Sequence, residues 1–195
     1  MKVKNIMPNE SQNKIKRTKP APKTEDIQKV EEVSASITID EPRTKFVPKD
    51  IDPNQYVTVR NGFQGKLIYI AKRTGEKFKW DEFGDEQEME LGELKNAKSS
   101  NKKFFINNWF MFDEPWIIDY LGVNQYYRFA IKIDDFDKIF EMSPAEIEET
   151  LQNVSEGQKK SIAYRARTLI AEEKIDSNKV ISTLERCLGV DLIEK

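Results

Sequence analysis

Carboxylates gather in one stretch in the middle of the chain, without a lysine or arginine between them. They are Asp81, Glu82, Asp85, Glu86, Glu88, Glu90 and Glu93. Carboxylate oxygens suit Ca²⁺ and Mg²⁺, but the stretch lacks EF-hand spacing with its glutamate at the twelfth position. The sequence favours a solvated acidic face that also gives a helix start favourable negative charge, or a docking surface for a basic partner. Asp85, Glu86 and Glu88 are the candidate contacts on it.

The chain has no histidine. The commonest general base, the Ser-His and Cys-His nucleophile pairs and nearly every ordinary zinc or iron site are therefore excluded. Glycines stand at Gly62, Gly65, Gly75, Gly84 and Gly92. Their spacing is typical of turns and does not match that of a phosphate-binding loop. We expect a protein that is not an enzyme, with no catalytic residue, no metal and no cofactor.

Aromatic side chains crowd residues 104–112 and continue at Trp116, which follows Pro115. Most of this apolar surface is predicted to pack the sheet against a helix that Pro115 begins. The remainder is predicted to form a contact surface, because exposed aromatics mark interfaces. Trp109, Phe110 and Trp116 are the candidate partner contacts.

Basic residues offer an alternative partner, a nucleic acid. Up to Lys23 the chain holds seven bases against one acid, a net of +6. The candidate phosphate contacts there are Lys14, Lys16, Arg17 and Lys19, and on a later helix Lys160, Tyr164 and Arg167 share one side. The net charge of the whole chain is −2, and from Glu141 onward eleven acids outnumber eight bases. This balance favours a solvated helix face paired with neighbouring glutamates over nucleic-acid binding.

Strand patterns fill residues 56–91. Residues 56–59 and 67–70 are rich in β-formers and flank Asn61-Gly62, the pair most often found in tight hairpins. A turn at residues 73–75 leads to Phe78 and Trp80, which share one face of a third strand. These patterns predict a small antiparallel sheet, a hairpin or meander with a barrel-like form.

Helix patterns fill the C-terminal part. Ser143-Pro144-Ala145-Glu146 has the form of an N-cap with a capping box, and apolar residues then recur at helical spacing in three segments, with Gly189 as a C-cap. The sequence predicts an α+β protein with a disordered charged arm over residues 1–52, a β-rich domain over 53–133 and a three-helix bundle over 134–195.

No stretch of the sequence is apolar enough to span a membrane or to act as a signal peptide. The single Cys187 agrees with a reducing compartment. We therefore expect a protein that stays in the cytoplasm of the cell that makes it and has no membrane partner.

Several short motifs together resemble one protein family. They are Val57-Thr58-Val59, Gly65-Lys66-Leu67-Ile68-Tyr69, Arg73-Thr74-Gly75, Trp80-Asp81-Glu82-Phe83-Gly84-Asp85-Glu86, Asn107-Asn108-Trp109 and Asp119-Tyr120-Leu121-Gly122. From about Val57 to the C-terminus the chain resembles small, mostly uncharacterised proteins of tailed bacteriophages, often encoded among virion structural genes.

The resemblance implies a non-enzymatic virion structural or assembly protein with other phage structural proteins, such as neck or tail proteins, as partners. It places the chain in the virion and in the cytoplasm of the infected bacterial host. The alternative is a nucleic-acid-associated phage accessory protein that uses the basic arm and the basic helix face.

Overall fold

The computed structural model describes residues 48–193, which all lie in one compact unit. The predicted arm, apart from residues 48–52, falls outside the described residues. So do its candidate phosphate contacts Lys14, Lys16, Arg17 and Lys19.

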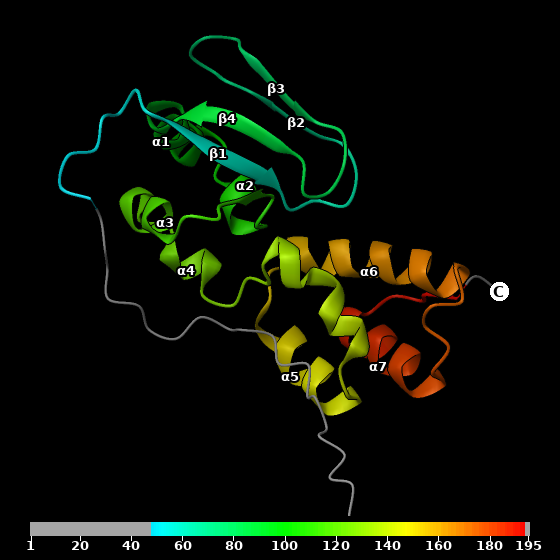
Figure 1. Ribbon diagram of the computed structural model, residues 1–195. Helices are drawn as coiled ribbons and strands as arrows, with labels where there is room; N and C mark the ends of the chain where they lie inside the picture. Colours follow the sequence, from blue (N-terminus) through cyan, green and yellow to red (C-terminus); the bar gives the residue numbers. More distant parts are fainter. Residues whose placement is uncertain (1–47, 194–195) are drawn as a thin grey trace, which may run out of the picture. The chain divides into compact units, whose positions relative to one another are not determined.

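The described chain is a mixed α+β fold with two small antiparallel sheets (Figure 1). The strands are β1 (Tyr56–Asn61), β2 (Leu67–Ile70), β3 (Lys77–Trp80), β4 (Glu86–Glu90) and β5 (Phe110–Met111). One sheet has the order β4-β1-β5, and the other pairs β2 with β3. The α+β class and the antiparallel pairing are as the sequence predicts.

The predicted hairpin at Asn61-Gly62 is wrong. Strand β1 pairs with β4 and β5, whereas β2 pairs with β3. The side chain of Asn61 is fully buried and explains the difference. Its amide donates to the carbonyl oxygens of Gly65 (2.8 Å) and Glu82 (2.7 Å), and its oxygen accepts from the amide of Phe63 (2.9 Å). The chain therefore leaves β1 in a loop held by this side chain, not in a two-residue turn.

Helices make up most of the remainder. They are α1 (Leu91–Ser100), α2 (Lys103–Ile106), α3 (Pro115–Leu121), α4 (Asn124–Tyr127), the 3₁₀ helix η1 (Ile133–Glu141), α5 (Pro144–Asn153), α6 (Glu156–Ala171) and α7 (Asn178–Leu188). The predicted cap of α5 is confirmed as a full capping box between Ser143 and Glu146, and Gly189 ends α7 in the left-handed region.

The prediction of a three-helix bundle is not confirmed. Residues 48–193 hold eight helices. The apolar core under α5, α6 and α7 also takes in η1, since Phe136 and Ile139 pack in one cluster with Ile147, Ile162 and Leu184. The boundary predicted between residues 133 and 134 stays a prediction.

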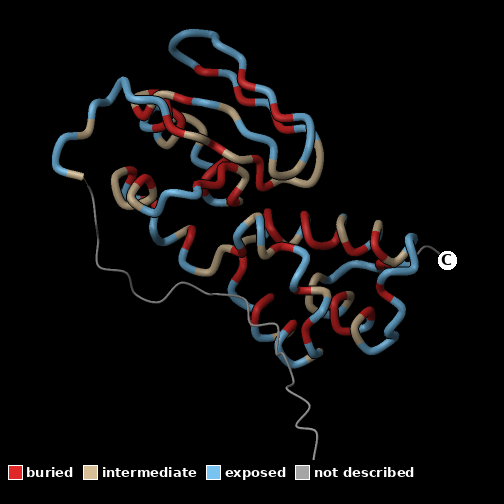
Figure 2. The backbone as a smooth tube through the Cα atoms, viewed as in Figure 1, coloured by how far each residue is buried: buried red, intermediate tan, exposed pale blue. Residues whose placement is uncertain are grey.

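The larger core lies against the sheets (Figure 2). Strand alternation turns Tyr69 and Trp80 inward, where their rings each lie 5.5 Å from the ring of Phe110. The ring of Phe104 lies 4.8 Å from it. Phe110 has no exposed surface, so its prediction as a partner contact is wrong. It lies on a strand between packed aromatics, where burial of its ring stabilises the fold.

The first half of α6 is held by hydrogen bonds to the loop after β1 and to the segment that precedes η1. The hydroxyl of Ser161 donates to the carbonyl oxygen of Gly62 (3.1 Å), and the buried amide of Gln158 makes two hydrogen bonds with the backbone of Ile131 (2.7 and 3.0 Å). These contacts connect residues that lie up to 99 positions apart in the sequence.

Candidate protein interface

Two isoleucines lie exposed on the outer side of β2. Ile68 is 41% exposed and Ile70 is 55% exposed. Successive residues of a strand point to opposite faces, and Leu67 and Tyr69 occupy the inner face against the core. The two isoleucines are therefore left on the outside as neighbours on one face.

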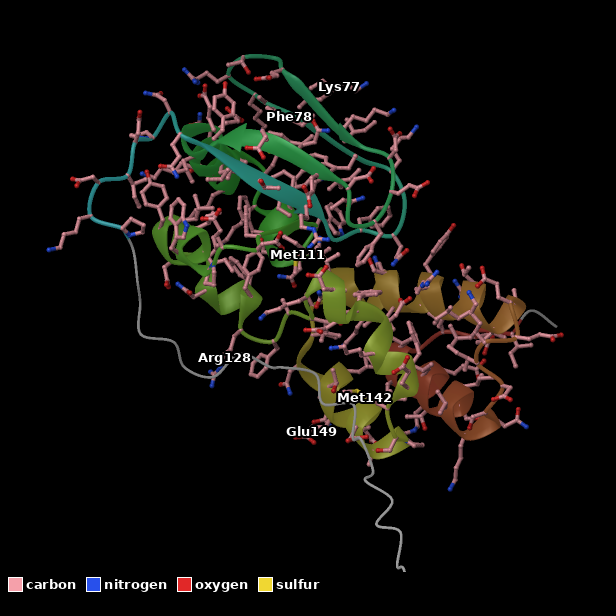
Figure 3. The ribbon with its side chains drawn as sticks, in the orientation of Figure 1. Lys77, Phe78, Met111, Arg128, Met142 and Glu149 are labelled. Carbon is pink, nitrogen blue, oxygen red and sulfur yellow. The ribbon has the colours of Figure 1, made fainter. Side chains whose placement is uncertain are left out.

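Lysines complete this outer face. Lys79 stands opposite Ile68 and Lys77 stands opposite Ile70 in the antiparallel register. Lys77 and the adjacent Phe78 point to opposite sides of β3, outward and inward respectively (Figure 3). Further exposed bases lie beside the strands at Lys66, Lys72 and Arg73. We call the outer surface formed by Ile68, Ile70, Lys77 and Lys79 the hairpin face.

One carboxylate lies close to the lysines of this face. Asp81 lies 2.7 Å from the Nζ atom of Lys79 and 3.4 Å from that of Lys66. The hydrogen bond from Lys79 is the main cause that lowers the pKa of Asp81. Both partners are about half exposed, so this pair adds little to stability and leaves the lysines accessible.

The outer side of β4 is acidic. Glu86, Glu88 and Glu90 alternate with inward residues and form a row that we call the acidic stripe. Each carboxylate has a partner across the strand on β1: Arg60 for Glu86 (3.6 Å), Thr58 for Glu88 (2.7 Å) and Tyr56 for Glu90 (3.2 Å). The hydrogen bond to Glu90 raises the pKa of the exposed Tyr56.

Asp85 has a local role as well. Its carboxylate accepts hydrogen bonds from the backbone amides of Asp81 (2.9 Å) and Glu82 (2.8 Å) and so fixes the loop before β4. In the described part of the chain, no group of three or more acidic or cysteine side chains is placed to hold a metal ion.

The predicted aromatic contacts are not gathered with the acids. Trp109 and Trp116 are half-buried. The ring of Trp109 packs edge-on against Phe63 (5.9 Å) and Phe104 (5.5 Å), and the indole of Trp116 donates to the carboxylate of Glu114. Trp109 leads into β5 at one edge of β1, whereas the acidic stripe lies on β4 at the other edge.

The predicted basic helix face forms on α6. Lys160, Tyr164 and Arg167 are all exposed there. Arg167 donates to the carbonyl oxygen of Asp191 (2.8 Å). The flanking Arg165 donates a hydrogen bond to Asp137 (2.5 Å), and this hydrogen bond raises the pKa of Arg165. Two of the four polar groups on this side therefore already have partners.

A cleft of about 640 Å³ lies beside Arg60 and Arg165. The guanidinium of Arg60 donates to Asp113 and Asp134, both at 3.1 Å. Burial by itself lowers the pKa of Arg60, but these two hydrogen bonds outweigh it and the pKa is raised. Because carboxylates already occupy both guanidinium groups, the cleft is better explained as an ion-pair network that fastens η1 to β1 than as a ligand site.

The hairpin face is not among the surfaces predicted from the sequence. Its signal is present in the sequence, because isoleucines alternate with core residues in β2 and lysines alternate with Phe78 and Trp80 in β3. The alternation predicts the strands, and its outer half places isoleucines and lysines on one exposed face.

The comparisons with known proteins add no constraint. Neither the family models, nor the curated proteins, nor the solved structures give a match to this chain. Within residues 48–193, no helix has the length and apolarity to cross a membrane.

Proposed function

We propose that the protein is a non-enzymatic phage virion structural or assembly protein that acts through protein contacts. Its partners would be other phage structural proteins, with neck and tail proteins as the first candidates, in the virion and in the cytoplasm of the infected bacterial host. The observation that carries the proposal is the hairpin face, where two isoleucines are exposed among lysines.

The composition of this face supports contact with another protein. Protein interfaces place apolar side chains at their centre and polar side chains at the rim. Ile68 and Ile70 provide the apolar centre, and the stems of Lys77 and Lys79 extend apolar surface toward a charged rim. Burial of both isoleucines on a partner would remove apolar area from water.

The remaining parts of the proposal concern the scaffold. We assign the two small sheets to one barrel-like β-rich domain that presents the contact surfaces. We assign helices α5, α6 and α7 to a compact three-helix unit that supports it. The half-buried Trp109 and Trp116 provide secondary contact surface beside the main one.

Quantitative mass spectrometry of purified particles of a phage that encodes this chain tests the proposal. The chain is expected at a fixed low integer ratio to a virion protein of known copy number, such as the major capsid protein. Its absence from washed particles would overturn the virion assignment and leave a factor of the infected cell.

A nucleic-acid-associated accessory protein is the second candidate. It is favoured by the exposed side chains of Lys160 and Tyr164 on one side of α6. Binding to DNA or RNA that falls steeply as salt rises would support it, because phosphate contacts release counterions. Lys160→Ala should then weaken binding while Lys179→Ala, on α7, should not. Salt-tolerant, stoichiometric association with a virion protein would decide against it.

A further inference from the structure

We propose that the hairpin face of one copy of this chain docks on the acidic stripe of a second copy. The inference rests on the proposed function and names one partner of the same surface. A head-to-tail contact of this kind repeats along a ring or a filament, because the two surfaces in contact are different.

The hairpin face and the acidic stripe lie in segments of opposite charge. Residues 66–79 carry five bases, Lys66, Lys72, Arg73, Lys77 and Lys79, against the single acid Glu76. Residues 81–90 carry six acids and no base. Two neighbouring segments of one chain thus have opposite charge, and complementary potentials steer partners together and fix their register.

The charged side chains of the two surfaces share the same spacing. The outer side chains of both surfaces lie on strands at every second residue: the exposed Lys77 and Lys79 on β3, and the exposed Glu86 and Glu88 with the half-buried Glu90 on β4. Side chains two residues apart on a strand are roughly 7 Å apart on one face. Two strand faces with the same repeat can bring several lysine–glutamate pairs into contact at once.

Both surfaces also carry exposed apolar side chains. Next to Glu90 on the acidic side stands Tyr56, which is 60% exposed. It offers an apolar ring to the isoleucines of the hairpin face. The net charge of the whole chain, −2, is small enough that repulsion between copies does not oppose the contact.

The test measures the mass of the full chain in solution by light scattering or sedimentation. At low ionic strength the wild type is expected at twice the mass of one chain, 22.8 kDa, or more. At about 1 M salt the Debye length is roughly 3 Å, so the attraction between exposed charges is screened and association should weaken severalfold or more. Lys77→Glu with Lys79→Glu, and separately Glu86→Lys with Glu88→Lys, should each give single chains.

Mixing the two charge-reversed variants is the decisive step. The first keeps its acidic stripe and the second keeps its hairpin face, so the mixture should regain association that neither variant shows alone. Lys174→Glu with Lys179→Glu changes the charge by the same amount at exposed positions outside both surfaces, and this control should associate like the wild type.

Other occupants of the face would overturn the proposal in distinguishable ways. A wild type that stays single at all concentrations, or association that survives both reversals, would contradict it. Loss of oligonucleotide binding in the Lys77→Glu, Lys79→Glu variant, without any self-association of the wild type, would assign the face to nucleic acid. Neutralising Glu31, Glu32, Asp40 and Glu41 in the full chain could abolish association while Glu86→Lys with Glu88→Lys does not. That result would make residues 31–41 the occupant of the hairpin face in place of the acidic stripe. Mass spectrometry of purified particles is independent of these outcomes, because it tests the proposed virion function and not the self-association of the chain.

Discussion

Tyr69 and Glu93 form a buried polar pair inside the aromatic core. The Tyr69 hydroxyl donates to the Glu93 carboxylate at 2.5 Å, and the two residues are 1% and 6% exposed. Burial is the main cause that raises the pKa of Tyr69, and the hydrogen bond to Glu93 raises it further. The phenol is therefore held as a donor, and it satisfies an acid that would otherwise be buried without a strong partner.

Tyr69→Phe should lower the free energy of unfolding by about 1–3 kcal/mol, because it leaves the Glu93 carboxylate buried without its donor. Urea unfolding at neutral pH measures the loss. Tyr164→Phe, at an exposed position of α6, is the matched control and should change stability by less than about 0.5 kcal/mol.

The same pair predicts a dependence on pH. The pKa of Tyr69 is raised in the folded state above its unfolded value of about 10, so the folded state keeps the proton longer. Its contribution to stability is fully present below pH of about 10 and is lost as pH rises toward the folded pKa. The wild type should therefore lose more stability than Tyr69→Phe between neutral pH and alkaline pH. Equal losses in both proteins would contradict this assignment.

At the scale of elements, the seating of α6 depends on a glycine. A Cβ atom at Gly157 would overlap the backbone carbonyl oxygen of Asn107. The turn at Asn108 adds to the constraint, since this residue has a φ of 53° and its amide donates to the carbonyl oxygen of Tyr126 (2.8 Å). Backbone meets backbone at this point, so neither side can yield as a flexible side chain would.

Gly157→Ala should therefore destabilise the protein by about 1–3 kcal/mol, the range for overpacking. Alanine in place of glycine inside a helix normally stabilises by about 1 kcal/mol, so the sign of the effect is the test. Urea unfolding measures it. Lys160→Ala, one turn further along α6 and exposed, should have an effect near zero. A stabilised Gly157→Ala variant would show that α6 does not press against Asn107.

At the scale of the whole described chain, two large apolar cores and a smaller apolar cluster of Leu169, Ile175 and Ile181 share one unit. One core holds the aromatics of the sheets and the other lies under α5, α6 and α7. The hydrogen bond from Ser161 to Gly62 connects the two regions, and the hydrogen bonds of Gln158 hold α6 to the backbone of Ile131 in the second core; both residues are about 1% exposed. Buried hydrogen bonds are costly to break one at a time, so the two cores are expected to unfold together.

Two probes can test this cooperativity without any label. All three tryptophans, Trp80, Trp109 and Trp116, lie in or against the core of the sheets, so their fluorescence reports that core. Far-UV circular dichroism reports mainly the helices. The two transitions should coincide in urea, and Gln158→Ala should shift both midpoints downward together. Transitions that separate in the wild type would show two independent units.

Local signals predicted much of the fold. The Ser143–Glu146 cap, the left-handed Gly189 and the inward pair Phe78 and Trp80 are where the sequence places them. Each of these depends on residues within a few positions of one another. The Asn61-Gly62 prediction failed for the complementary reason, because the Asn61 side chain found partners at Gly65 and at the distant Glu82.

The candidate contacts likewise divide into those that nearby residues predict and those that depend on distant residues. Glu86 and Glu88 are exposed, as a run of acids on a strand predicts, and Lys160 and Tyr164 are exposed on one helix side. Phe110 could not be recognised as a core residue from its neighbours, because the rings that cover it come from β2, β3 and α2. The hairpin face likewise depends on tertiary structure, because packing of the inner side of β2 and β3 against the core decides which side chains stay outside.

The sequence by itself determined where most strands and helices lie and that histidine chemistry is absent, because periodicity, capping and residue type act over short distances. Only the tertiary structure decided which strands pair, which aromatics are covered and how α6 meets the loops of the sheet region. Those outcomes depend on contacts between residues far apart in the chain, such as Arg60 with Met111 and Gly62 with Ser161. Their free energies arise only when the packed elements exclude water together.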